Sequence, residues 1–400
     1  MSIISERIKN LSNSATLEMA QKSRELKEQG VDVVNLSIGE PDFNTPDCIK
    51  GAAIQAIQLN HTHYTAVPGI QELRRAIADK LKNENGLDYS PEQIVVSNGA
   101  KHSIANAILC LVNPGDEVIV PSPYWVSYPE IIKLAEGRMV DIPASIDQDF
   151  KINAKQLKKA ITEKTKVFLF NSPNNPTGSV YTKDELKAFA DVLCEYPNVF
   201  IISDEIYEYI NYNGKHESIA QFESVKERVI VVNGVSKGYA MTGWRIGYTA
   251  SSLEIAKACN KLQGQITSGA ASISQYAALS AMKSVPCSSP DVRNMVETFA
   301  ERRNLVLEKL KTIPGIKANE PPGAFYVFPN ISYYFGKSSG DYIINTDNEL
   351  CLYLLDKAHV AAVPGDAFGN PNCIRISYAT SNKNLQKALR RMKEALAHLH

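Results

Sequence analysis

The stretch Val231-Val-Asn-Gly-Val-Ser-Lys-Gly-Tyr-Ala-Met-Thr-Gly-Trp-Arg-Ile-Gly247 decides how this chain folds. It continues an apolar run that is typical of a strand buried on both faces of a sheet. The run leads into a turn that holds Ser236 and Lys237, and Arg245 follows before the next apolar run. A lysine at a strand end, in apolar surroundings, can have its pKa lowered by desolvation and form a Schiff base with a carbonyl. A single lysine after a strand is more often a solvated surface residue, so its surroundings must decide.

Similar apolar runs recur up to residue 250 and alternate with amphipathic stretches, for example at residues 101–111 and 182–195. The second stretch opens on Thr182-Lys-Asp-Glu185, a capping-box pattern that marks the start of a helix. We predict seven strands, at residues 93–97, 117–121, 138–142, 166–171, 199–204, 229–233 and 247–250. Strands that alternate with helices in this way predict an α/β fold, with a mostly parallel seven-stranded sheet and helices on both faces.

The pattern changes after residue 290. A long charged helix at residues 292–312 precedes Pro- and Gly-rich strand signals around 321–329, a helix at 348–357, a strand at 373–378 and a closing helix at 382–399. These elements predict a smaller α+β domain. We therefore expect a large domain of residues 47–289 and a small domain of residues 290–400. An N-terminal segment of residues 1–46, with a helix at 16–29, is expected to pack with the small domain.

Composition narrows the class of protein. The 400 residues are 44% hydrophobic and 22% charged, which is ordinary for a globular protein. Lys and Arg together number 43, as do Asp and Glu, so the formal net charge is zero. This balance gives no support to nucleic acid or an anionic membrane as partner. No apolar run approaches the ~20 residues of a membrane span, and charges occupy the place of a signal peptide's apolar core. We expect a cytoplasmic protein.

Cysteine and histidine spacing argues against a metal site. The seven cysteines are scattered and form no CxxC pair, and none of the seven histidines has metal-ligand spacing. Reduced, mostly buried thiols are the simpler interpretation. We therefore predict that the protein uses no metal.

Three other strand ends hold polar residues. Ile201-Ile-Ser-Asp204-Glu-Ile-Tyr207 places a carboxylate and a phenol at the carboxyl end of a buried strand, where open α/β sheets bind ligands. Asn171-Ser-Pro-Asn-Asn-Pro-Thr-Gly178 offers the amide of Asn175. Val96-Ser-Asn-Gly-Ala-Lys101 runs into a helix start whose free N–H groups form an anion cradle. Each has an ordinary explanation alone: a capping Asp with a packed Tyr, a turn, and a common strand–helix connection.

Taken together, the four pieces supply what a pyridoxal phosphate site requires: an aldehyde-binding lysine, a carboxylate for a pyridinium, donors for a phenolic oxygen and a phosphate cup. The chain resembles the class I aminotransferases of the fold-type I pyridoxal-phosphate superfamily. More narrowly, it resembles bacterial aspartate aminotransferases that share Asn-Gly-x-Lys and Met-Thr-Gly-Trp-Arg-Ile-Gly. The resemblance extends from Asn13 to Tyr378.

The resemblance implies a role for each matching residue toward pyridoxal 5′-phosphate. Lys237 would hold the cofactor as an internal aldimine and shuttle the substrate Cα proton. Asp204 would keep the ring nitrogen protonated, and Tyr207 with Asn175 would bond the phenolic oxygen. The remaining cofactor ligands would hold the phosphate or stack on the ring: Gly99, Ala100, Lys101, Ser236 and Arg245 at the phosphate, and Trp125 on the ring.

The same resemblance implies substrate contacts and a homodimer with shared active sites. Arg375, between two isoleucines on a predicted strand, would grip the α-carboxylate with its bidentate fork. Gly39, in Ser37-Ile-Gly-Glu-Pro-Asp-Phe43, would bring main chain against the substrate, beside Trp125 and Asn175. Tyr64 would reach the phosphate of the partner subunit.

The substrate side chain is where the sequence departs from part of the family. Animal-type and enteric aspartate aminotransferases read the distal carboxylate with an arginine, and residues 263–275 here contain none. The bacterial subgroup places a lysine at Lys101, and we predict that Lys101 replaces the arginine, aided by Trp125 and by Thr16 from the partner. A solvated helix lysine is the alternative. Relatives that accept prephenate carry a lysine near Ser12, so the serine argues against that activity.

The predicted function is the transfer of an amino group from an L-amino acid. The favoured donor is aspartate, and the favoured acceptor is 2-oxoglutarate. The alternatives are an aminotransferase of aromatic amino acids, alanine or prephenate, and a β-lyase or decarboxylase on the same fold, which would share Lys237, Asp204 and Arg375. A regulator's effector domain would need a DNA-binding domain before Ser37, and the segment there is too short. A nucleotide-binding protein would need a GxGxxG or Walker pattern, and neither occurs.

Overall fold

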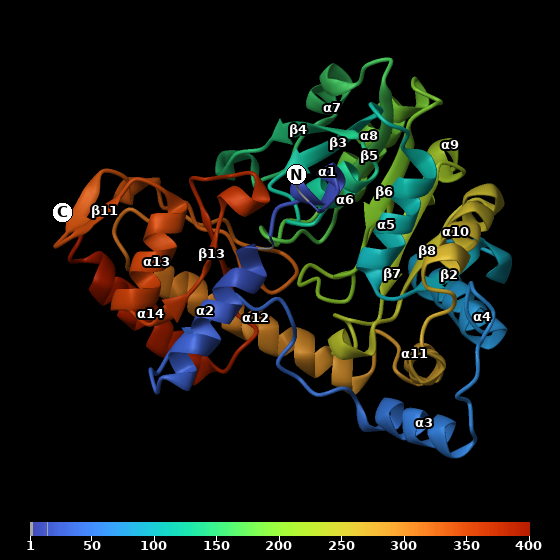
Figure 1. Cartoon of the computed structure of the whole chain (residues 1–400), viewed down its shortest axis with the longest axis horizontal. Coiled ribbons are helices and arrows are strands. Elements are labelled where there is room, and N and C mark those ends of the chain that lie inside the picture. The colour runs from blue at the N-terminus through green and yellow to red at the C-terminus, as the bar shows by residue number, and fades with distance from the viewer. Residues whose placement is uncertain (1–2, 14) are drawn as a thin grey trace.

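The computed structural model describes residues 3–13 and 15–400, and its larger part is built on one twisted sheet (Figure 1). The sheet has seven strands in the order β2-β8-β7-β6-β5-β3-β4. Their bounds are β2 Ile94–Ser97, β3 Glu117–Ser122, β4 Arg138–Pro143, β5 Thr165–Asn171, β6 Phe200–Asp204, β7 Val229–Gly234 and β8 Gly247–Ala250. All neighbouring pairs are parallel except those of β8, which runs antiparallel to β2 and β7. The predicted α/β fold is confirmed.

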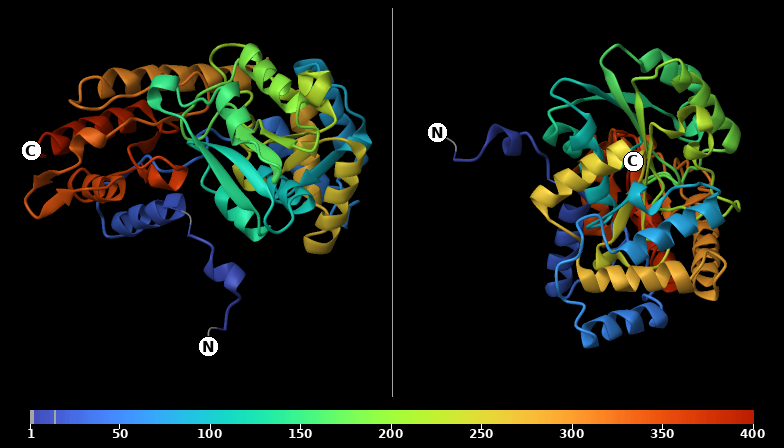
Figure 2. Two further views of the ribbon diagram at one scale, coloured as in Figure 1. Left: turned by 90° about the horizontal axis from the view of Figure 1, so that it is seen from above. Right: turned by 90° about the vertical axis from the view of Figure 1, so that its right-hand side faces the viewer.

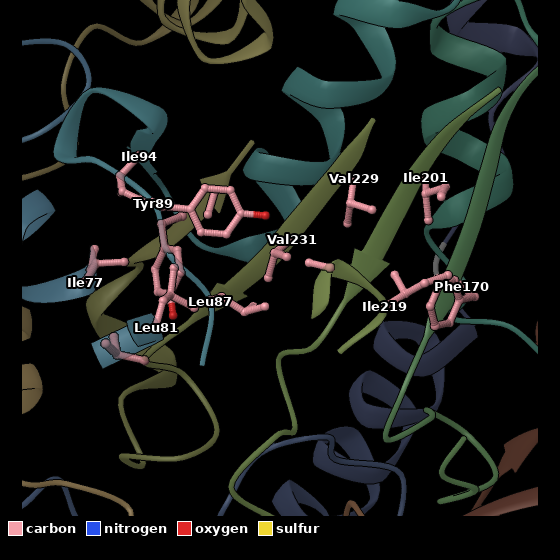
Figure 3. Close-up of a cluster of buried hydrophobic side chains, with 14 of the residues drawn as sticks. Ile77, Leu81, Leu87, Tyr89, Ile94, Phe170, Ile201, Ile219, Val229 and Val231 are labelled. Atoms are coloured by element: carbon pink, nitrogen blue, oxygen red, sulfur yellow. The ribbon is translucent and has the colours of Figure 1, made fainter. Parts of the chain in front are cut away.

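Alternate residues of the strands pack into two separate hydrophobic layers. Val167 and Leu169 of β5 face a layer completed by helices α5 (Ala100–Leu111), α6 (Tyr128–Leu134) and α10 (Leu253–Ile266). Phe168 and Phe170 face the other layer, part of which Figure 3 shows with Val229 and Val231 of β7. Because successive side chains of a strand point to opposite faces, continuous apolar runs follow from a sheet that is covered on both sides.

The helices over this second face are α3 (Asp47–Gln58), α4 (Gln71–Lys80), α7 (Ala154–Ala160), α8 (Lys183–Cys194), α9 (Glu223–Lys226) and α11 (Ser272–Ser284). The capping box predicted at residues 182–185 begins α8. The Thr182 side chain accepts from the Glu185 N–H at 3.3 Å, and the Glu185 carboxylate accepts from the Thr182 N–H at 2.7 Å. Two N–H groups without intrahelical acceptors are thereby satisfied.

A second hydrophobic core lies in the C-terminal part, at the left of Figure 1. It is enclosed by α12 (Pro290–Leu310), α13 (Asp347–Lys357), α14 (Asn382–Leu396) and a sheet of order β13-β14-β9. The bounds of these strands are β13 Val363–Pro364, β14 Ile374–Ser377 and β9 Tyr326–Val327. A separate hairpin pairs β10 (Lys337–Ser339) with β11 (Tyr342–Ile344).

The N-terminal segment contacts this C-terminal part. Strand β1 (Val34–Asn35) pairs in parallel with β12 (Val360–Ala361), and Met19 of helix α2 (Ala15–Glu28) joins the same core. Before α2, short helix α1 (Glu6–Lys9) and its flanking residues extend away from the body of the molecule (Figure 2). The domain limits at residues 46 and 289 stay a prediction. Within residues 3–13 and 15–400, the structure has no helix with the length and apolar character needed to cross a membrane.

Candidate active site

The predicted site residues converge at one edge of the large sheet. The carboxyl ends of β2, β5, β6 and β7 meet there, as parallel strands require. We expected all four sequence segments to lie at the ends of parallel strands, but Arg245 reaches this edge in a different way. It precedes β8, and because β8 is antiparallel, its first residue Gly247 pairs with Ser97 at the end of β2 and with Gly234 at the end of β7.

A cavity of about 260 Å³ opens at this edge. Eleven of the predicted residues line it: Gly39, Ala100, Lys101, Trp125, Asn175, Asp204, Tyr207, Ser236, Lys237, Arg245 and Arg375. Gly99 lies beside it, at the turn before α5, but its N–H donates to the Ser97 carbonyl at 2.8 Å and is not free for an anion as expected. Tyr64 does not reach the cavity of its own chain and is 99% exposed. Thr16 also lines the cavity, and it comes from the same chain, which corrects the expectation that the partner supplies it.

Lys237 lies in the cavity with the properties of a nucleophilic amine. Its Nζ donates a hydrogen bond to the Gly39 carbonyl, from the segment predicted to touch substrate. Desolvation, assisted by the guanidinium groups of Arg375 and Arg245, lowers the pKa of Lys237 to about 8, although Glu40 and Asp204 act in the opposite direction. Near neutral pH a usable fraction of this amine is therefore unprotonated.

Asp204 is a buried carboxylate to which no cation among the described residues is hydrogen-bonded. Tyr128 Oη donates to its Oδ2 at 2.6 Å, and the Ile206 N–H donates to its Oδ1 at 3.2 Å. Burial raises the pKa of Asp204 to about 6, while the bond from Tyr128 holds it down. A positively charged ring nitrogen in the cavity would stabilise the ionised carboxylate.

Arg375 is a buried cation that bonds no carboxylate in the part of the chain that the structure describes. The residue is only 2% exposed. Its neighbours Ile374 and Ile376 point into the hydrophobic core, as strand alternation predicts. Its Nη1 donates to Asn175 Oδ1 at 3.0 Å and its Nη2 to the Ser37 carbonyl at 2.6 Å. Its Nε has no hydrogen-bond partner among the residues that the structure describes. A buried guanidinium that bonds only neutral groups is costly unless a ligand anion completes it.

The turn between β2 and α5 forms a cradle with no room for side chains. Gly99 has φ +85°, and a Cβ there would lie 2.3 Å from Arg245 Nη2. A Cβ on Gly247 would lie 2.2 Å from the Ala100 nitrogen. The first N–H groups of α5 have no intrahelical acceptor, so they and Arg245 are available to an anion such as phosphate.

Lys101 and Trp125 lie together on the cavity wall. Lys101 Nζ is 5.0 Å from the Trp125 ring centroid, and burial, followed by the charge of Arg245, lowers the pKa of Lys101. Trp125 in turn meets Tyr128 edge to face at 5.5 Å. Lys101 thus lies at the cavity beside Trp125 and is exposed to solvent, so the alternative of a solvated helix lysine stays open.

The sequence did not identify two tyrosines that contact the predicted residues. Tyr128, which bonds Asp204, follows Trp125 closely, but nothing in its context separates it from a packed core tyrosine. Tyr326 lines the cavity and bonds Tyr207, from a strand 119 residues away. A hydrophobic strand predicts burial for Tyr326, and only the folded chain shows which side chains it meets.

Similarity to known proteins agrees with this geometry. The family model described as aminotransferase class I and II matches residues 31–392. A bifunctional aspartate aminotransferase and glutamate/aspartate-prephenate aminotransferase of Petunia hybrida is 48% identical, over 98% of this chain and 82% of that protein.

Two solved structures are also similar over essentially their whole length. The aspartate aminotransferase of Rhizobium meliloti has a TM-score of 0.96 and 41% identity, covering 100% of both chains. The aspartate aminotransferase of Thermus thermophilus with maleate has a TM-score of 0.93 and 40% identity, covering 99% of this chain and 100% of that one. With a family model spanning nearly all its residues and relatives this similar, the chain belongs to the class I and II aminotransferases.

Proposed function

We propose that this aminotransferase uses pyridoxal 5′-phosphate and moves the amino group of L-aspartate to 2-oxoglutarate. The observation that supports it most is the arrangement around Lys237: a buried carboxylate without a bound cation, Asp204, and a buried guanidinium without a bound anion, Arg375, line one cavity with a lysine of lowered pKa. A ligand with a cationic ring and a substrate with a carboxylate would complete both groups.

The residues present fit the cofactor. Asp204 would pair with its ring nitrogen, and Trp125 would cover one face of the ring. Asn175 already accepts from Arg375 through Oδ1, which leaves its amide N–H groups free to donate to the phenolic oxygen together with Tyr207. The Gly99 turn, Ser236 and Arg245 would take the phosphate.

When bound, pyridoxal phosphate supplies an electron-accepting ring that stabilises negative charge developing at the substrate Cα. The protein supplies the rest. Arg375 binds the α-carboxylate with the Nη hydrogens that its bonds to Asn175 and Ser37 leave over, and so orients the Cα–H bond. Lys237 Nζ removes the Cα proton, because an amine of pKa about 8 is a competent base near neutral pH.

Lys101 supports the choice of a dicarboxylate. Its charge is not needed for the α-carboxylate, which Arg375 would bind, or for the phosphate, which the turn before α5 would bind. Thr16 lines the same cavity, and its Oγ1 is a buried hydroxyl with no partner among the described residues. The Thermus relative is similar along the whole chain, and its structure holds maleate, a dicarboxylate. Ser12 has no charged side chain with which to bind a second carboxylate, and its N–H donates to Glu130. We therefore propose that prephenate is a poor acceptor, even though the petunia relative's name includes it.

A homodimer with shared sites forms part of the proposal. Tyr64 projects fully into solvent, next to α3, whose Ile54 and Ile57 are 57% and 53% exposed. Exposed apolar side chains grouped in this way are typical of a surface that another chain covers. Tyr64 of the partner subunit would then complete the phosphate cradle.

The decisive test is a spectral titration of the protein loaded with pyridoxal phosphate. We expect a visible absorption band that aspartate and glutamate convert to the amine form of the cofactor, and that oxaloacetate and 2-oxoglutarate restore. A protein that binds the cofactor but releases pyruvate or ammonia from amino acids, with no such interconversion, would instead be a lyase.

A further inference from the structure

Tyr326 contacts both Arg375, the proposed ligand of the substrate carboxylate, and Tyr207, a proposed ligand of the cofactor. It opens β9, where it pairs with Ser377 of β14, and Arg375 lies two residues earlier on the same face of β14. The Arg375 guanidinium carbon is therefore 4.6 Å from the Tyr326 ring centroid, with Phe368 on another side at 5.0 Å. The aromatic faces hold the guanidinium in place without using its N–H groups.

The hydroxyl group of Tyr326 meets that of Tyr207. The two oxygens are 2.9 Å apart, both side chains are buried, and both line the cavity. A hydroxyl has one hydrogen to donate and two lone pairs, so one bond between two hydroxyls leaves one hydrogen over. Which tyrosine donates decides which tyrosine has a hydrogen for a ligand.

The charge of Arg375 favours Tyr326 as the donor. The guanidinium lies against the Tyr326 ring, and a positive charge makes a nearby O–H more acidic and hence a stronger donor. Burial raises the pKa of Tyr326, and Arg375 is the largest influence that opposes this rise. For Tyr207 burial raises the pKa as well, and the bond with Tyr326 raises it further.

We propose that Tyr326 is a positioning residue that donates its hydrogen to Tyr207 and so directs the Tyr207 O–H into the cavity. This inference rests on the proposed cofactor, whose phenolic oxygen would accept the hydrogen from Tyr207. The ring of Tyr326 would then orient Arg375, which binds the α-carboxylate, and its hydroxyl would orient Tyr207, which bonds the phenolic oxygen. It also explains Gly39, because a Cβ there would lie 2.8 Å from Tyr326 Oη.

The readout is the pH midpoint at which the visible band of the bound cofactor shifts. A hydrogen bond from Tyr207 stabilises the anionic, deprotonated oxygen and therefore lowers this midpoint. Loss of the Tyr326 hydroxyl should raise it by about 0.5–1 pH unit, the size of one uncharged hydrogen bond. The charged groups that face the tyrosine pair are Arg375, Asp204, Lys237 and Glu40, and Tyr326→Phe leaves all four in place.

The experiment is a double-mutant cycle on four proteins loaded with pyridoxal phosphate: wild type, Tyr326→Phe, Tyr207→Phe and the double variant. We expect a rise in midpoint for Tyr326→Phe, a larger rise for Tyr207→Phe, and no further rise in the double variant, because Tyr326 acts through Tyr207. Tyr353→Phe is the matched control. Its buried hydroxyl bonds the Ala395 carbonyl at 2.8 Å, outside the cavity, and its loss should leave the midpoint unchanged.

An unchanged midpoint in Tyr326→Phe would overturn the inference. So would a double variant whose midpoint exceeds that of Tyr207→Phe by as much as Tyr326→Phe exceeds wild type. Thermal unfolding of each variant excludes a trivial loss of fold, and Phe retains the ring against Arg375. If wild type itself gives no pH-dependent visible band with pyridoxal phosphate, the proposed function fails, and that result is distinct from failure of the Tyr326 inference alone.

Discussion

Asp204 and Arg375 are buried ionisable side chains, and neither bonds an opposite charge within residues 3–13 and 15–400. Each is held by neutral groups: Tyr128 and a backbone N–H for the carboxylate, Asn175 and a backbone carbonyl for the guanidinium. Such groups cost free energy in the empty protein, and the cost is recovered when a ligand of opposite charge binds. Stability and catalysis should therefore respond in opposite directions to their removal.

Asp204→Asn is expected to abolish transamination while making the cofactor-free protein more stable at pH 7. The folded-state pKa of Asp204, about 6, lies above the ordinary value of 3.8, so folding opposes its ionisation. The folded state binds more protons than the unfolded state between these values, and stability falls as pH rises from about 4 to 6. The penalty is about 2–3 kcal/mol.

Urea unfolding of the cofactor-free proteins checks this. Asp204→Asn should gain stability over wild type at pH 7 and little or nothing at pH 4, where Asp204 is protonated in both states. An Asn variant that is less stable than wild type at pH 7 would contradict the prediction.

Lys101→Ala is expected to change substrate choice. A charged hydrogen bond to the distal carboxylate contributes about 1.5–3 kcal/mol, so kcat/KM for aspartate should fall about 10- to 150-fold. Alanine and phenylalanine, which lack that carboxylate, serve as controls and should be nearly unaffected. Equal losses on both classes would mean that Lys101 does not read the distal carboxylate.

Among the elements, the turn from β2 into α5 is the one proposed to hold the phosphate of the cofactor. It holds Gly99 in a left-handed conformation, under Arg245 and next to the first N–H groups of the helix. Glycine is required there both for the positive φ and for the space. Gly115 offers a comparison for the effect of space, because it also has a positive φ, +87°, and nothing lies within 4 Å of its Cβ position.

Gly99→Ala is expected to weaken pyridoxal phosphate binding by at least about tenfold, because the Cβ displaces the Arg245 guanidinium from the cradle. Gly115→Ala also places a side chain on a residue with positive φ, at a cost of about 1 kcal/mol or more, without touching the cradle. Both variants should lose stability in thermal unfolding, and only Gly99→Ala should lose cofactor affinity in equilibrium titration. Equal affinities would show that Arg245 tolerates the methyl group.

At the scale of the whole molecule, Tyr64 is 99% exposed and does not line the cavity that holds Lys237. A dimer with shared sites would give it a function, and complementation tests this directly. Lys237→Ala and Tyr64→Ala proteins should each be poorly active. Hybrids formed by unfolding and refolding them together should regain activity, because one site then combines an intact Lys237 with an intact Tyr64 from the other subunit.

Unmixed parents carried through the same refolding are the control. Sedimentation should give a dimer for the wild type. A fully active monomer, or a mixture no more active than its parents, would contradict the shared site.

Much of the fold followed from local pattern. The seven strands begin and end within a residue or two of their predicted limits, because buried parallel strands leave unmistakable apolar runs between polar turns. The turn chemistry at Gly99, Asn175 and Lys237 was equally local. The antiparallel direction of β8 was not predicted, since a strand's composition does not encode its direction when both faces are buried. That direction brings Arg245 to the turn between β2 and α5.

By itself, then, the sequence determined the class of fold, the strand ends that bear chemistry and the types of group they present. Only the tertiary structure decided which groups meet. Arg375 bonds Asn175 across 200 residues, and Tyr326 reaches Tyr207 across 119. Tyr128 and Tyr326 lie in runs that predict burial and nothing more. The physical reason is that a hydrogen bond depends on distances of a few tenths of an ångström between distant segments, and those distances are set by the packing of two hydrophobic cores.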